Sequence, residues 1–125
     1  MKVDWQTGLV AHLGIEFLEV TPDRVVARLA MNENLATVGG TIHGGTLMAF
    51  ADTIGAAGTV ANLEDGQRTA TLESKTNFIA PCRAGYVRAE AIPIHKGKRT
   101  HVWETRITDE AGKLLSVTTQ TQIVL

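Results

Sequence analysis

The chain has 125 residues, of which 44% are hydrophobic and 20% charged, so we expect one globular domain with a core of its own. Its formal net charge of −1 argues against a nucleic-acid partner or an anionic membrane surface. The single cysteine, Cys82, excludes an internal disulfide and suits a reducing compartment. The charges within Met1–Trp5 leave no apolar region for a secretory signal, so we expect a cytoplasmic protein.

The first part of the chain predicts a short helix and two strands. Apolar residues recur at helical spacing over Trp5–Leu13, and Gly14 is expected to end this helix. Ile15–Thr21 and Val25–Met31 have the composition of strands, joined by a turn at Pro22–Arg24 where proline presets the backbone angle. A polar loop is expected to follow the second strand.

A long apolar helix is predicted in the middle of the chain. From about Gly45 to Asn62, apolar residues such as Leu47, Phe50 and Ile54 recur at helical spacing. The segment approaches the length of a membrane span, but Asp52 lies in its middle. We therefore expect a helix buried in a soluble protein and no contact with a membrane. Because aromatic residues make up only 5% of the chain, its core should be aliphatic and rich in small side chains.

After residue 68 the hydrophobic pattern changes to a period of two, which predicts strands. The segments are Thr69–Ile79, Tyr86–Ile94, Thr100–Thr108 and Leu114–Leu125. A hairpin turn at Asp109–Gly112 joins the last two. A single helix with an apolar face can bury itself only against such a set of strands, so the sequence predicts one α+β domain over residues 1–125.

The candidate site lies where the long helix begins. His43 precedes Gly44 and Gly45, whose backbone N–H groups are left unpaired by a helix start and lie at the positive end of the helix dipole. Asp52 follows about two turns later, and its neighbours at i±3 and i±4 include no cation. A helix start suited to an oxyanion, together with a carboxylate on the same helix, predicts a catalytic pair.

With these residues the sequence resembles the hotdog-fold acyl-CoA thioesterases of the phenylacetic-acid-degradation type, within the 4-hydroxybenzoyl-CoA thioesterase superfamily. The resemblance is carried by Gly40–Asp52, by Thr71–Phe78 with the turn Pro81–Gly85, and by the closing hairpin. It extends from about residue 10 to the C-terminus. It implies an antiparallel sheet of five or six strands wrapped around one long central helix. It also implies a homodimer, often paired into a homotetramer, with the thioester at the dimer interface.

The resemblance also implies roles for single residues. Asp52 would act as general base or as nucleophile, and the backbone N–H of Gly44 or Gly45 would polarise the thioester carbonyl. His43 would orient the thioester or its sulfur leaving group. Thr71, supplied by the partner subunit, would hydrogen-bond the attacking water or the acid. Donors at a helix start would stabilise the oxyanion by roughly 3–4 kcal/mol each. No metal is required, and no cofactor beyond the coenzyme A of the substrate.

Further residues are expected to bind the substrate. Relatives commonly carry Asn or Gln at the position of Thr37, six residues before the histidine, so here a hydroxyl replaces an amide. Met48 is expected to line the pocket for the acyl group. In the basic hairpin that follows residue 94, Lys98 and Arg99 would neutralise coenzyme A phosphates, with Arg83 as a further candidate. The alternative for this basic run is a solvated turn.

The sequence thus predicts an acyl-CoA thioesterase that releases a carboxylic acid and free coenzyme A, with the acyl group left open. One alternative is a non-catalytic acyl-CoA-binding or regulatory module on the same fold, which the missing amide at Thr37 favours and Asp52 opposes. The other is a hydratase or dehydratase, which needs a paired Asp and His in a loop signature that is not found here. The histidines and Cys82 show no metal-ligand spacing.

Overall fold

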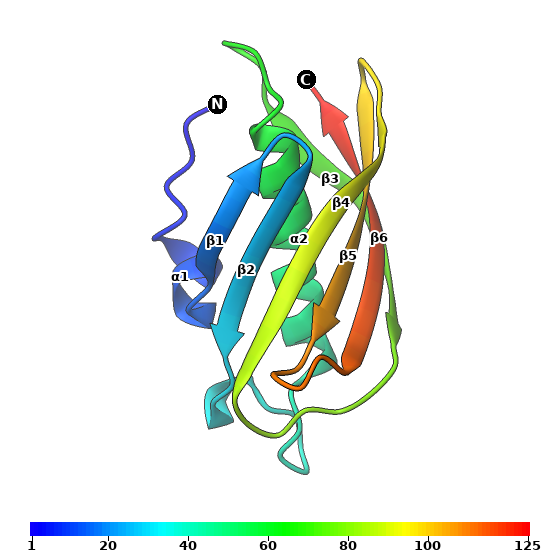
Figure 1. The fold of residues 1–125 in the computed structure, drawn as a ribbon. Coiled ribbons are helices and arrows are strands. Elements are labelled where there is room, and N and C mark those ends of the chain that lie inside the picture. Colours follow the sequence, from blue (N-terminus) through cyan, green and yellow to red (C-terminus); the bar gives the residue numbers. More distant parts are fainter.

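The computed structural model describes residues 1–125 and shows a six-stranded antiparallel sheet curved around one long helix (Figure 1). In chain order the elements are α1 (Gly8–Leu13), β1 (Glu16–Thr21), β2 (Arg24–Ala30), the 3₁₀ turn η1 (Glu33–Leu35), α2 (Gly44–Val60), β3 (Thr69–Phe78), β4 (Tyr86–Lys96), β5 (Thr100–Thr108) and β6 (Leu114–Val124). The strands are ordered β1-β2-β4-β5-β6-β3, and every neighbouring pair is antiparallel. The predicted α+β class, with six strands and one long helix, is confirmed.

The predicted segments agree with the structure to within a few residues, apart from two differences near the N-terminus. The first helix begins at Gly8 rather than Trp5, because Asp4 and Thr7 form side-chain hydrogen bonds with the backbone of a turn that precedes it. The expected polar loop after β2 contains η1, which begins directly after its N-cap, Asn32. Both differences arise from short polar side chains that bond to nearby backbone groups.

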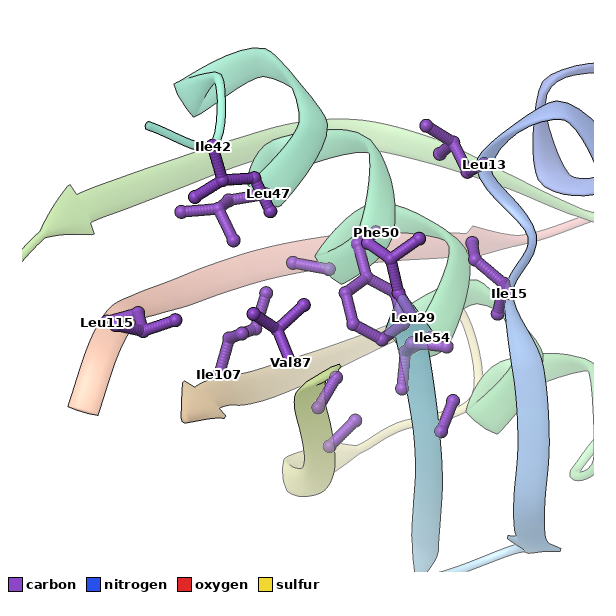
Figure 2. Close-up of a cluster of buried hydrophobic side chains, with 14 of the residues drawn as sticks. Leu13, Ile15, Leu29, Ile42, Leu47, Phe50, Ile54, Val87, Ile107 and Leu115 are labelled. Atoms are coloured by element: carbon purple, nitrogen blue, oxygen red, sulfur yellow. The ribbon is translucent and has the colours of Figure 1, made fainter. Parts of the chain in front are cut away.

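The side of α2 that faces the sheet forms the centre of the core. Figure 2 shows Leu47, Phe50 and Ile54 of α2 pointing toward side chains of the strands, among them Leu29 and Val87. Phe50 and Ile54 have no exposed surface. Phe50 and Trp103 are the only Phe, Tyr or Trp residues in the buried cluster, so the expectation of an aliphatic, small-residue core is confirmed.

Two glycines of α2 let the sheet come close to the helix. A Cβ on Gly58 would lie 2.5–2.7 Å from three ring carbons of Trp103, and a Cβ on Gly55 would overlap the side-chain amide of Gln120. Carbon atoms in contact are normally about 3.5–4.0 Å apart. Any larger residue at these positions would therefore push β5 or β6 away from the helix.

The sheet ends in two edge strands, β1 and β3. β3 pairs with β6 on one side only, and its two largest apolar side chains, Leu72 and Phe78, are 57% and 54% exposed. An edge strand with exposed backbone groups and apolar side chains is a surface on which another strand can pair. None of the helices has the length and apolar character needed to cross a bilayer.

Candidate active site

The start of α2 presents one free backbone donor. His43 is the N-cap, and its Nδ1 accepts a hydrogen bond of 2.7 Å from the N–H of Gly45. The N–H of Gly44 has no hydrogen-bond partner in the chain. Of the two glycines predicted as oxyanion donors, Gly44 is therefore the one whose N–H is available.

The same contact fixes the tautomer in which the neutral ring of His43 caps the helix. Because Nδ1 accepts a hydrogen bond, the neutral ring carries its proton on Nε2. The side chain is exposed, so this Nε2–H can donate to a bound molecule. This geometry suits the predicted role of His43 toward a thioester or its sulfur.

Asp52 lies about two turns further along α2, half-buried on the side that faces β3. Its Oδ1 accepts a hydrogen bond of 2.6 Å from Thr71 Oγ1 and one of 3.1 Å from Gln120 Nε2, whereas its Oδ2 accepts none. The contact between Asp52 and Thr71 corrects the expectation that the partner supplies Thr71. Since β3 is paired with β6 and packs against α2 of its own chain, Thr71 reaches Asp52 without a partner.

Two amides that the sequence analysis missed complete the surroundings of Asp52. Gln120 and Gln122 of β6 are both fully buried. Gln122 Nε2 donates to Thr71 Oγ1 at 2.6 Å, and its Oε1 lies 2.9 Å from Thr69 Oγ1. A signal for them was present, because residues 118–122 are all polar, so either face of this strand must carry polar side chains. The buried polar residues of β6 are Ser116, Thr118, Gln120 and Gln122. Buried polar groups need hydrogen-bond partners, and those of Gln120 and Gln122 include Asp52 and Thr71.

An apolar hollow of about 420 Å³ opens beside Gly44. Its lining residues are Ile42, Gly44, Leu47, Phe78, Ile79, Ala80 and Pro81. The ring of Phe78 lies against Gly44, so that a Cβ there would be 3.0 Å from the ring Cζ. Met48, which was predicted to line the acyl pocket, is 36% exposed and lies one turn of α2 from both Gly44 and Asp52. The hollow thus joins a mostly apolar lining to the free N–H of Gly44.

The basic residues predicted to bind phosphates lie at opposite ends of α2. Arg83 donates from Nη1 to the carbonyl of Gly39 at 2.7 Å, and so braces the loop that precedes the helix. Lys98 and Arg99 lie in the β4–β5 hairpin, at the same end of the molecule as the loop that follows the helix (Figure 1). Neither Lys98 nor Arg99 forms an ion pair. Lys98 lines a polar hollow of about 450 Å³ with residues of that loop.

Thr37 belongs to the tight loop before α2. Its N–H donates to the carbonyl of Thr41 at 2.8 Å, and its carbonyl accepts from the N–H of Gly40 at 3.1 Å. No hydrogen bond of its hydroxyl group is found, so this group is free to bind a ligand.

A second buried polar group lies near the C-terminal end of α2. His101 Nδ1 is 3.1 Å from Thr59 Oγ1, which accepts a hydrogen bond of 2.9 Å from Trp103 Nε1. Burial, and next the charge of Lys96, lower the pKa of His101 from its usual 6.5. The ring is therefore neutral in the folded protein at neutral pH.

The spacing of Gly44 and Asp52 limits what one chain can do alone. Eight residues of α-helix separate them by roughly 12 Å along the axis. An oxyanion donor and a base or nucleophile must both lie about 3 Å from the reacting groups. The two groups of one chain therefore cannot act on the same thioester.

The chain is similar to known thioesterases over most of its length. Residues 39–116 match the model of the Thioesterase superfamily. The chain is 36% identical over 110 residues to a 1,4-dihydroxy-2-naphthoyl-CoA hydrolase of Listeria monocytogenes. This match covers 88% of this chain and 89% of that protein. A thioesterase structure from Haemophilus influenzae matches with a TM-score of 0.92 at 33% identity, over 97% of this chain and 85% of that one.

Two solved structures of a protein from Staphylococcus aureus also match, each with a TM-score of 0.92 over 94% of this chain and 98% of that one. They are 25% and 26% identical to this chain, and they carry alanine in place of a glutamate and of a glutamine, respectively. The matched residues include the start of α2, Asp52, Thr71 and all residues that line the hollow beside Gly44. Fold, matched residues and identity together show that the chain belongs to the thioesterase superfamily, as a hotdog-fold hydrolase of thioesters.

Proposed function

We propose that this thioesterase hydrolyses an acyl- or aryl-CoA to the free acid and coenzyme A, at a site built between two chains. The observation that carries the proposal is the pairing of an unbonded N–H at Gly44 with a carboxylate at Asp52 whose Oδ2 is free. The curated relatives that act on coenzyme A thioesters support the substrate class.

A second copy of the chain, paired along β3, would bring the two groups together. Asp52 lies beside Thr71 near one end of β3, and Gly44 lies beside Phe78 at its other end. In an antiparallel pair with Thr71 opposite the partner's Phe78, Asp52 therefore faces the partner's Gly44. The free edge and exposed apolar side chains of β3 support this homodimer. Pairing of two such dimers into a homotetramer is the further expectation.

At this joint site each group has one task. The N–H of Gly44 stabilises the negative charge that develops on the thioester oxygen, an effect of roughly 3–4 kcal/mol for one donor. Asp52 of the other chain uses its Oδ2 to take a proton from water or to attack the carbonyl carbon. His43 donates a hydrogen bond from its Nε2–H to the departing sulfur. The chemistry calls for no cofactor besides the coenzyme A carried by the substrate.

The remaining substrate contacts follow from the same pairing. The hollow beside Gly44 takes the acyl group. Because the two α2 helices run antiparallel across the two-fold axis, Lys98 and Arg99 of one chain approach the start of the partner's helix, where they meet the phosphates. The Staphylococcus aureus structures support a place in the site for both Thr37 and Asp52. The glutamine and the glutamate replaced in them are separated by the same number of residues as Thr37 and Asp52 are in this chain.

The test is a thiol-release assay with a panel of aryl-, short-, medium- and long-chain acyl-CoA substrates. Asp52→Asn removes the base or nucleophile, and Gly44→Pro removes the N–H donor. Proline is favoured at the first position of a helix, and the φ of −66° and ψ of 135° at His43 suit a residue before proline. Each variant is expected to lower kcat by about 100-fold or more. A binding module would instead bind acyl-CoA and release no thiol even as the wild type.

Mixed dimers test whether the site is shared. A heterodimer of an Asp52→Asn chain and a Gly44→Pro chain has one site with both defects and one with none, so it should recover about half of the wild-type activity. Differently tagged chains, co-expressed and purified by both tags, supply this heterodimer. A heterodimer as inactive as its two parents would place the site within one chain and refute the joint site.

A further inference from the structure

We infer that Gln120 and Gln122 are positioning residues for Asp52, and that they hold its Oδ1 so that Oδ2 alone is left for the reaction. The inference rests on the proposed function, in which Asp52 is the base or nucleophile. Neither amide touches the thioester, and each acts through the carboxylate.

Gln120 holds the carboxylate directly. Its Nε2 donates to Asp52 Oδ1 at 3.1 Å and to the backbone carbonyl of Asp52 at 3.2 Å, so one amide binds both the side chain and its helix turn. Gln120 has no exposed surface, and its amide occupies the space that a Cβ on Gly55 would need. Gly55 is thus part of the same arrangement, because it lets the amide come under α2.

Gln122 acts one bond further away, through Thr71. An amide N–H can only donate, so Gln122 Nε2 takes a lone pair of Thr71 Oγ1 at 2.6 Å and leaves the hydroxyl proton for Asp52 Oδ1 at 2.6 Å. The Thr69 hydroxyl lies 2.9 Å from Gln122 Oε1 and also 2.9 Å from the carbonyl oxygen of Ile123. A carboxylate oxygen can only accept. Both hydrogen bonds that reach Oδ1 therefore have a fixed direction.

The burial of Gln120 favours a functional role over packing. Its Oε1 is buried without a hydrogen-bond partner, which lowers the stability of the folded chain. An apolar side chain of similar length would fill the same space without this loss. Both hydrogen bonds that the buried amide donates go to Asp52, the candidate catalytic acid. A residue that costs stability and contacts this acid is expected to serve the reaction and not the folding of the chain.

The test compares Gln120→Met with the matched control Thr118→Val. Methionine keeps the length of glutamine but has no donor. Thr118 lies on the same buried face of β6, and its hydroxyl contacts Thr76 instead of Asp52. In Gln120→Met we expect kcat to fall by roughly 10- to 100-fold with little change in KM. Gln122→Met should change kcat in the same direction by less.

The pH profile and the melting temperature separate positioning from packing. In Gln120→Met the ionised form of Asp52 loses a hydrogen-bond donor, so ionisation is less favourable than in the wild type. The acid limb of the pH profile of kcat/KM should therefore move to higher pH. Its melting temperature should stay at or above that of the wild type, and Thr118→Val should keep the wild-type kcat and pH profile. Wild-type kcat and profile in Gln120→Met would overturn the inference, as would equal losses in both variants.

Failure of the proposed function gives a different result. The wild type would then release no thiol from any acyl-CoA, or Asp52→Asn would keep the wild-type rate, and the inference would fall with it. A wild type that needs Asp52, combined with an unaffected Gln120→Met, overturns the positioning role alone.

Discussion

Replacing Gly58 with alanine tests how closely the sheet packs on α2. Alanine is favoured over glycine in a helix interior by about 1 kcal/mol. Against this, the new Cβ would lie 2.5–2.7 Å from three ring carbons of Trp103, so the ring must move by about 1 Å to restore a normal contact. Trp103 is fully buried and its Nε1 is bonded to Thr59 at 2.9 Å. Overpacking costs about 1–3 kcal/mol and a strained hydrogen bond about 1 kcal/mol more, so we expect a net destabilisation of about 1–3 kcal/mol.

Urea unfolding followed by circular dichroism measures this change. Protein concentration is held constant, because the apparent stability of an associating chain depends on it. We expect a lower urea midpoint with an unchanged m-value. In a Trp103→Phe background the clashing ring carbons are absent, so Gly58→Ala should cost much less there. A Gly58→Ala protein as stable as the wild type would refute the close contact between helix and sheet.

Three further variants test the contacts of Thr71, of the basic hairpin and of His101. Thr71→Val removes one of the two hydrogen bonds to Asp52 Oδ1. In the thiol-release assay kcat should therefore fall by roughly tenfold or more at nearly constant KM. An unchanged kcat would show that the hydroxyl has no part in the reaction. Lys98→Ala combined with Arg99→Ala should raise KM for an acyl-CoA and leave KM unchanged for the matching acyl-pantetheine, which lacks the nucleotide phosphates. Equal effects on both KM values would show that these residues do not bind the phosphates. Burial lowers the pKa of His101 below its usual 6.5, so the unfolded chain takes up this proton first and the free energy of unfolding falls as the pH drops through about 6.5. In His101→Gln this pH dependence should be weaker, and an equal dependence would assign it to other groups.

The elements of the fold could be predicted because their signals are local. Helical spacing located α2, and a period of two located each strand of the second half. The place of β3 could not be predicted in this way. It precedes β4 in the chain but pairs with β6 at the sheet edge, and this pairing depends on contacts between residues about 50 positions apart, such as Thr71 and Gln122.

The sequence named candidate residues for the site, whereas the contacts between them depend on the fold. The sequence could not show which glycine keeps a free N–H, because the rotamer of His43 decides it. It could not show that Thr71 meets Asp52 in its own chain, because that contact depends on where β3 lies in the sheet. Hydrophobic alternation could not point to Gln120, because the inner face of β6 carries polar residues.

The unpaired edge of β3 has a consequence for how activity scales with the amount of protein. If a complete site forms only when the β3 strands of two chains pair, single chains in dilute solution are inactive. The rate of hydrolysis is then proportional to the concentration of dimers and not to that of chains. Below the dissociation constant, doubling the protein would then raise the number of complete sites by about fourfold. A cell that made this enzyme near that concentration would turn a modest change in expression into a steep change in thioester turnover.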